Sequence, residues 1–125
     1  MLGPEGDGYG TSIQIVLLQP HSRGEVTLAS ANPDEMPVVS PNFLKDPRDL
    51  EAMITGLRYF RRTLETRPIA DRIEKIIAPD PDDFSDETLA AHCKKMVKTS
   101  YHPVGTAKMG ADGDAMAVLD AKMRV

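Results

Sequence analysis

The run from Tyr101 to Gly110, YHPVGTAKMG, contains the residues of this chain best suited to chemistry. His102 stands directly before Pro103, whose ring fixes its own φ and biases the preceding residue toward an extended backbone. An imidazole titrates near neutral pH and can therefore accept or donate a proton in the cell. A rigidly presented histidine is a candidate general base, and a hydrogen-bonded loop histidine is the structural alternative.

The other histidines, the cysteine and the acidic stretches are predicted to have structural roles. His92 and Cys93 are neighbours on a predicted helix, where adjacent side chains point about 100° apart and do not readily share one metal ion. The acidic stretch at 80–83 lacks the glycine and the terminal glutamate of a calcium loop, and GADGDA at 110–115 also lacks the required ligands. We therefore predict no metal site, a core position for Cys93, and a solvated His21.

Composition argues against several classes of partner. The formal net charge is −4, and the basic residues form no block interleaved with aromatic side chains, so we expect no nucleic-acid partner. No segment approaches the ~18 apolar residues of a membrane span, and the first ten residues carry no export signal. Cys93 is the single cysteine, which rules out an internal disulfide framework and favours a reducing compartment. We expect a cytoplasmic protein without a membrane span.

The elements that must position His102 begin with a predicted sheet. Residues 1–10 form a glycine-rich lead-in, and residues 11–125 form one domain. The apolar run 13–19 and the alternating run 25–30 predict an antiparallel hairpin or two neighbouring strands. Arg23 and Gly24, in the turn between them, are expected to brace the hairpin. The proline-rich stretch that follows allows at most a short edge strand at residues 38–39.

Helices are predicted after this stretch. Asp46 and Pro47 give an N-cap and a first helical position, and an apolar stripe follows until Pro68. A shorter helical piece is predicted at 69–77, and a third helix begins at the N-cap Ser85. The chain then runs extended through His102, turns at 110–115 and ends in a strand-like segment, 117–125. The predicted fold class is α+β, an antiparallel sheet flanked by helices.

Four motifs, in order, resemble the C-terminal substrate domain of the glucose-methanol-choline (GMC) family of flavoprotein oxidoreductases. They are LLQPHSRGEVTLAS at 17–30, the passage from Asn32 into the helix at 46–62, YHPVGTAKMG at 101–110, and AVLDAKMRV at 117–125. The likeness spans roughly residues 9–125. Four ordered motifs are far more specific than any single one.

The resemblance implies a parent enzyme of the choline or alcohol dehydrogenase type. In such enzymes a Rossmann-like domain binds FAD, and the domain represented here roofs the flavin and shapes the pocket for a small-molecule alcohol. The alcohol loses its hydroxyl proton and passes a hydride to the flavin. His102 stands at the position of the family's active-site histidine, which hydrogen-bonds the substrate oxygen and assists its deprotonation.

The departures from the family pattern limit what this chain is expected to do alone. The sequence contains no G-x-G-x-x-G turn for a dinucleotide, and it ends before the segment that carries the family's second catalytic residue. Ala107 and Lys108 stand at positions where the family frequently has a cysteine and more commonly has an arginine. We expect a partial domain that is inactive without its flavin domain, exposes an apolar patch and self-associates. The alternative is a free-standing, non-catalytic binding or assembly module derived from the same domain.

We expect the purified 125-residue chain to be colourless and to take up no flavin, because it lacks the turn that would hold the pyrophosphate. An absorbance spectrum recorded after incubation with FAD and gel filtration tests this expectation. A yellow protein that retains flavin through the column would overturn it.

Overall fold

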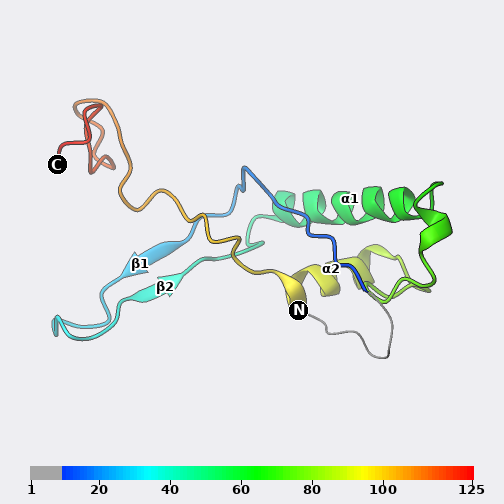
Figure 1. The fold of residues 1–125 in the computed structure, drawn as a ribbon. Helices are drawn as coiled ribbons and strands as arrows, with labels where there is room; N and C mark the ends of the chain where they lie inside the picture. Colours follow the sequence, from blue (N-terminus) through cyan, green and yellow to red (C-terminus); the bar gives the residue numbers. More distant parts are fainter. Residues whose placement is uncertain (1–9) are drawn as a thin grey trace.

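A computed structural model describes residues 10–125, so the predicted lead-in at 1–10 lies, except for Gly10, outside the described residues. The elements follow the order β1, β2, α1, a short 3₁₀ helix and α2. The strands are β1 (Glu25–Thr27) and β2 (Val38–Ser40), and the α-helices are α1 (Pro47–Leu64) and α2 (Asp86–Met96). The helices lie together at one end, and the two strands reach away from them (Figure 1).

Helix α1 begins where the sequence predicts. The Asp46 carboxylate caps it by accepting from the backbone N–H of Arg48 at 3.0 Å, and Pro47 occupies the first turn. Hydrogen bonds from Arg48 hold the pKa of Asp46 well below its usual range. The predicted apolar stripe of α1 is half-buried, from Leu50 to Leu64. Both the N-cap and the stripe are therefore confirmed.

Helix α2 packs against α1 and supplies the most deeply buried apolar side chains. Ser85 caps it, accepting from the backbone N–H of Thr88 at 3.3 Å, as the sequence predicts. Leu89 is fully buried, and Cys93 is 4% exposed, which confirms its predicted core position. Burial raises the pKa of the Cys93 thiol. The small core between the helices thus depends on the inner face of α2.

Arginines of α1 connect it to α2 and to the loop before it. Arg58 pairs with Asp86 at 2.6 Å, and the Arg61 guanidinium lies 4.8 Å from the centre of the Phe84 ring. Arg61 also donates to the carbonyl of Pro81 at 3.2 Å. The Arg58 pair is exposed and contributes little stability, whereas stacking on Phe84 fixes the approach of the loop.

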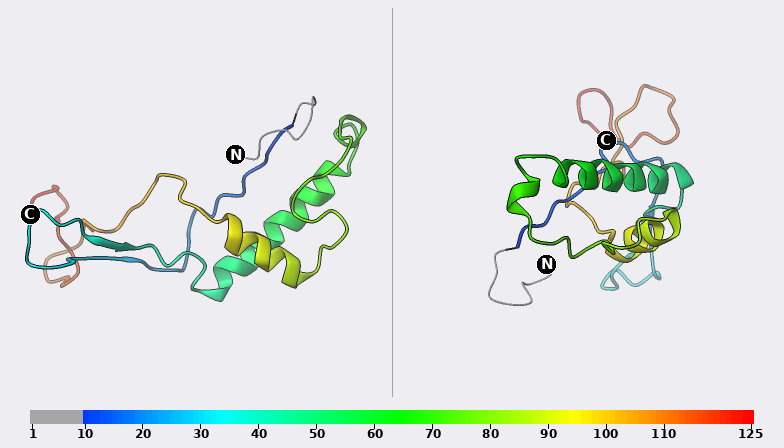
Figure 2. Two further views of the ribbon diagram at one scale, coloured as in Figure 1. Left: turned by 90° about the horizontal axis from the view of Figure 1, so that it is seen from below. Right: turned by 90° about the vertical axis from the view of Figure 1, so that its right-hand side faces the viewer.

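The predicted strand at 13–19 is wrong. This segment has no strand structure and runs irregularly across the helix pair (Figures 1 and 2). Ile15 lies against Gly56 of α1, where a Cβ would stand 2.9 Å from the Ile15 Cγ2. A short apolar run does not distinguish a strand from an extended segment packed on a helix. Here the Ile15 side chain packs on α1 at the point where Gly56 has no side chain of its own.

The strand partner of β1 is β2, the short edge strand that the sequence allowed at 38–39. The two strands pair antiparallel with Val26 opposite Val39. Gly24 stands at the base of this hairpin, where a Cβ would lie 2.5 Å from the carbonyl oxygen of Ser40. The lack of a side chain at Gly24 therefore permits the close approach of the two strands.

A buried carboxylate joins the hairpin to the helices. Asp49, in the first turn of α1, is 1% exposed and accepts hydrogen bonds from the backbone N–H groups of His21 at 2.7 Å and Ser22 at 2.8 Å. The Ser22 hydroxyl in turn accepts from the backbone N–H of Asp46 at 3.0 Å. Burial raises the pKa of Asp49, but the hydrogen bonds from Ser22 and His21 outweigh it and leave the pKa lowered.

Arg23 donates to backbone groups of the same turn, although the hairpin that it was predicted to brace, between 13–19 and 25–30, does not form. Its guanidinium donates to the carbonyl oxygens of Pro20 at 2.6 Å and of Ser22 at 3.0 Å. Asn42 donates from its side chain to the Arg23 carbonyl at 3.0 Å. The 20–23 turn is thus held by its own arginine and by residues on both sides of it, and His21 is exposed as expected.

Two further predicted elements are wrong. In place of the helical piece predicted at 69–77 the structure has a single 3₁₀ turn, Ala70–Arg72. The stretch between Pro68 and Pro79 is too short to sustain an α-helix. The predicted strand at 117–125 is replaced by turns and one isolated parallel bridge between Met109 and Leu119. The α+β class itself is confirmed, with a two-stranded antiparallel sheet and two helices.

We expect Asp49→Ala to lower the free energy of unfolding by about 2–4 kcal/mol, because two backbone donors lose a charged acceptor. Asp49→Asn, which keeps one acceptor oxygen, should lose less. The lowered pKa of Asp49 contributes stability that is present above about pH 4 and is lost as the pH falls through the folded-state value. The stability of the Asn variant should therefore fall less steeply with acid.

Urea unfolding of the three proteins between pH 7 and pH 3 measures both effects. Equal stability of Asp49→Ala and the parent chain would contradict this role for the carboxylate.

Candidate active site

The segment that carries His102 leaves α2 after Met96 and runs without regular structure toward a C-terminal lobe, residues 108–125 (Figure 1). Its side chains point to solvent: Tyr101 is 81% exposed, Val104 is 95% exposed, and His102 is also exposed. The structure therefore presents His102 on an open, irregular segment. Such a segment is accessible to a substrate or to another protein surface.

The backbone immediately before His102 makes a tight turn. Tyr101 has a φ of 65°, in the left-handed region that side-chain-bearing residues rarely occupy. Its backbone N–H donates to the hydroxyl of Thr99 at 2.9 Å. Gly105 follows with a φ of 107°, a value that favours glycine. Two special backbone positions thus flank the His102–Pro103 pair.

The C-terminal lobe begins directly after this segment. The Lys108 carbonyl accepts from the backbone N–H groups of Val118 at 2.8 Å and Leu119 at 3.1 Å, and the Gly110 N–H donates to the Leu119 carbonyl at 2.9 Å. A Cβ on Gly110 would lie 2.7 Å from the Cβ of Ala117. The run 108–110 is therefore fixed against 117–119, and this anchors the far end of the His102 segment.

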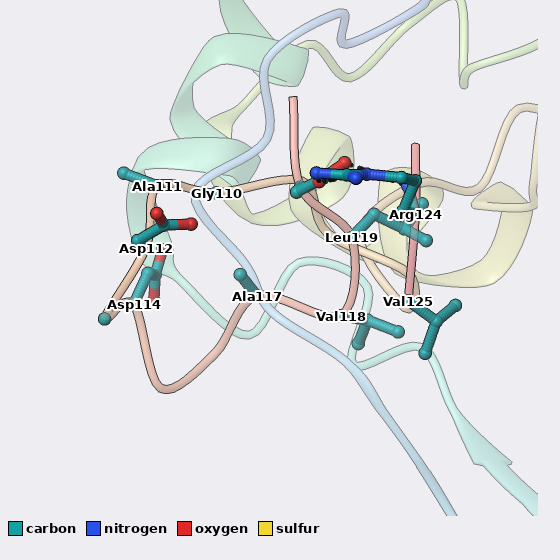
Figure 3. A pocket seen from close by; sticks show the side chains of 11 residues that line it. Gly110, Ala111, Asp112, Asp114, Ala117, Val118, Leu119, Arg124 and Val125 are labelled. Atoms are coloured by element: carbon teal, nitrogen blue, oxygen red, sulfur yellow. Dashed lines mark hydrogen bonds and ion pairs between the residues drawn. The ribbon is translucent and has the colours of Figure 1, made fainter. Parts of the chain in front are cut away.

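An open hollow lies within the C-terminal lobe, between the 110–114 turn and the chain end (Figure 3). Its acidic lining is largely neutralised, because Asp114 pairs with Lys108 at 2.5 Å and Asp120 pairs with Arg124 at 2.6 Å. The Lys108 side chain lowers the pKa of Asp114, and hydrogen bonds from Arg124 lower that of Asp120. Both ion pairs form within the lobe and engage the carboxylates of Asp114 and Asp120.

The other candidate ligands remain apart from one another. His92 is half-buried, as predicted, and its burial together with nearby Lys95 lowers the pKa of its imidazole. Across residues 10–125, no three histidine, cysteine or acidic side chains gather closely enough to hold a metal ion. In the same range, no helix has the length and apolar character needed to cross a membrane.

Most of this chain matches one protein-family model. The model described as GMC oxidoreductase, for the C-terminal part of these proteins, matches residues 20–125. The chain belongs to the GMC oxidoreductase family. The match includes the Asp49 contacts, both helices, the His102 segment and the C-terminal lobe, which confirms the family that the four sequence motifs indicate.

Curated relatives of this GMC chain carry the names of alcohol and choline oxidoreductases. An alcohol dehydrogenase [acceptor] of Pseudomonas putida is 40% identical over 105 residues, 84% of this chain and 19% of the relative. An oxygen-dependent choline dehydrogenase of Vibrio vulnificus is 36% identical over 120 residues, 95% of this chain and 21% of the relative. Choline oxidase of Arthrobacter globiformis is 34% identical over 125 residues, 94% of this chain and 23% of the relative.

The family implies FAD, but the described residues of this GMC chain do not fit its pyrophosphate. A dinucleotide phosphate needs a glycine-rich turn that opens onto a helix N-terminus free of negative charge. Helix α1 begins with Asp46 and Asp49, and α2 begins with Asp86 and Glu87, so each helix start already carries carboxylates, which disfavour an anionic ligand there. No step that passes through a flavin is therefore assigned to these residues.

Sequence reasoning missed two residues of this region. Nothing in the sequence around Asp46 indicates that Asp49, in the first turn of α1, is the carboxylate that is buried. Thr99 received no role, although a threonine two residues before a left-handed position is a known turn arrangement. The available signal was the spacing of Thr99, Tyr101 and Pro103.

We expect Gly110→Val to detach the 108–110 run from 117–119, because a side chain at this position would collide with Ala117. Amide hydrogen exchange of Val118 should then accelerate by up to roughly tenfold, since a backbone hydrogen bond contributes about 0.5–1.5 kcal/mol. Lys108→Met is the control: it breaks only an exposed ion pair, worth at most about 1 kcal/mol, and should leave this exchange nearly unchanged. Unaltered exchange in Gly110→Val would contradict the anchoring.

Proposed function

We propose that this chain is the substrate-side part of an FAD-dependent GMC oxidoreductase that oxidises a CH–OH group of an alcohol or of choline. The observation that carries the proposal is the exposed His102 segment within a chain whose residues 20–125 match the GMC family. The names of the relatives, alcohol dehydrogenase, choline dehydrogenase and choline oxidase, support the substrate class.

The proposed role of His102 is proton transfer at the substrate oxygen. An alcohol hydroxyl gives up its proton with difficulty in water, and a neutral imidazole nitrogen within hydrogen-bond distance can accept that proton as the carbon is oxidised. The flavin that accepts the hydride would be held by another part of the parent protein. Pro103 and the turn at Tyr101 support this role, because they restrict the backbone on both sides of His102.

The chain is not proposed to act alone. It spans about a fifth of the length of the curated relatives, 19% to 23% in the three described above. Leu89 and Cys93 are the buried apolar side chains of the described core, whereas Leu18, Leu28 and Met36 are each more than 80% exposed. Exposed apolar surface of this extent is typical of a part that packs against another domain. We therefore propose that a flavin domain covers it and completes the site.

We expect His102→Ala, in the full-length protein that carries this segment, to lower kcat for alcohol or choline oxidation by about 10²- to 10⁴-fold. His102→Gln, which keeps a hydrogen-bond donor but accepts no proton, should be similarly slow with a smaller change in KM. Steady-state assays with choline and with a primary alcohol, using a dye acceptor, measure both variants. Retained flavin absorbance is the control for correct folding, and a His102→Ala protein that turns over like the parent would sink the proposal.

A further inference from the structure

We infer that two copies of this chain associate through one face of the β1–β2 hairpin. The face is made by Val26, Leu28 and Val39, and we call it the hairpin face. The occupant is a second copy that offers the same face, so a twofold axis relates the two copies. The inference does not rest on the role proposed for His102 or on the substrate class.

The register of the two strands places the apolar side chains together. In an antiparallel pair, directly opposed residues project from the same side of the sheet, and successive residues along a strand alternate between sides. Val26 lies opposite Val39, so their side chains share one side. Leu28 follows Val26 by two residues and continues the same side just beyond the end of β1. The hairpin face is therefore apolar and uncharged.

The opposite side of the hairpin differs in character. Its paired residues are Glu25 with Ser40 and Thr27 with Val38, so three of its four side chains are polar. One apolar side and one mainly polar side are typical of an antiparallel sheet that buries its apolar side and leaves the other in water. The pattern indicates that another surface covers the hairpin face.

The described residues, 10–125, leave the hairpin face largely uncovered. Val26 is 48% exposed, Val39 is 62% exposed and Leu28 is 85% exposed. The hairpin reaches away from α1 and α2, so neither helix shields it (Figures 1 and 2). The face is thus open to a second molecule.

The surface of the chain is large enough for a stable dimer. The chain exposes 10901 Å², whereas a compact protein of its mass, 13.7 kDa, exposes about 6,600 Å². The nine residues outside the described range account for at most about 1,300 Å² of this difference, even when fully extended. A stable dimer buries about 800 Å² on each partner. The surplus surface is therefore sufficient for such an interface, with the hairpin face at its centre.

A second copy fits the chemistry of this face. An uncharged apolar face is complementary to itself, and twofold interfaces in which both copies use the same patch are the commonest in oligomers. The chain carries a formal net charge of −4, so two copies repel unless their charges stay off the interface. Glu25, the charged residue within the paired strands, lies on the opposite side. In a longer protein, a flavin domain that covers the hairpin would take the place of the second copy.

The test compares Val39→Lys with its matched control, Val38→Lys, in the purified 125-residue chain by sedimentation equilibrium. We expect the parent chain to form a dimer in equilibrium with its monomer. Val39→Lys places two like charges within the apolar contact and should raise the dissociation constant of the dimer roughly tenfold or more. Val38→Lys puts the same charge on the opposite side and should change the dissociation constant by no more than about twofold.

The two substitutions differ only in the side of the sheet that they change. Both replace a valine of β2 with a lysine, so both lower the strand propensity equally. Both positions are exposed and lie outside the core between α1 and α2. Cys93 is buried in that core and is the single cysteine, so slow reaction of its thiol with a thiol reagent confirms that each protein is folded.

A second pair of variants repeats the comparison on the β1 side of the hairpin. Leu28→Lys changes the hairpin face, and Thr27→Lys changes the opposite side. Because Leu28 is so widely exposed, its replacement removes no packing within the chain, and the comparison stays valid even where Val39→Lys fails to fold. Leu28→Lys should weaken the dimer, and Thr27→Lys should leave it nearly unchanged.

Three results would overturn the inference. The first is a parent chain that stays monomeric at every concentration measured, which would leave the hairpin face to another domain. The second is equal weakening of the dimer by Val38→Lys and Val39→Lys, which would indicate pairing along a free strand edge. The third is an open series of larger aggregates, because a twofold contact closes at two copies. None of these results bears on the role of His102, which its own variants test.

Discussion

The arrangement of this chain depends on one buried carboxylate. Asp49 lies in the first turn of α1, is almost fully covered, and accepts the backbone N–H groups of His21 and Ser22. Burial raises the pKa of this carboxyl, but the hydrogen bonds from Ser22 and His21 outweigh the effect of burial and leave the pKa lowered. Through these two hydrogen bonds the helix pair and the β1–β2 hairpin become one framework. The His102 segment starts from α2 and passes from that framework to the C-terminal lobe (Figure 2).

Polar contacts hold the base of the hairpin against the helices, whereas apolar side chains farther from this base are exposed to solvent. Ser22, Arg23 and Asn42 tie the base of the hairpin, and Gly24 allows its strands to meet closely. Beyond this base, the hairpin and the His102 segment expose large apolar side chains. A two-stranded sheet is marginally stable in isolation, and exposed apolar side chains favour association. These properties support the proposal that the open surface of this GMC chain packs against a flavin domain.

The starts of the two α-helices were predictable from the sequence, whereas the strand pairing and the long-range contacts were not. The N-caps Asp46 and Ser85 specify the starts of α1 and α2 through contacts within three residues, so residue type and spacing suffice. The partner of β1 depends on which of two short apolar runs pairs with it, and Ile15 instead finds the surface that Gly56 leaves open on α1. The burial of Asp49 depends on a turn 28 residues earlier in the chain. His102 was identified as a candidate by its motif, whereas the positive φ of Tyr101 beside it has no signal in the sequence.

The central claim is that His102 meets the oxygen of an alcohol substrate. The most direct measurement is an experimental structure of the full-length flavoprotein with a bound, unreactive alcohol analogue such as a carboxylate or a fluorinated alcohol. The account predicts an imidazole nitrogen of His102 within about 2.6–3.2 Å of the analogue oxygen. A structure in which the analogue is bound next to the flavin and the His102 imidazole points away into solvent would contradict it.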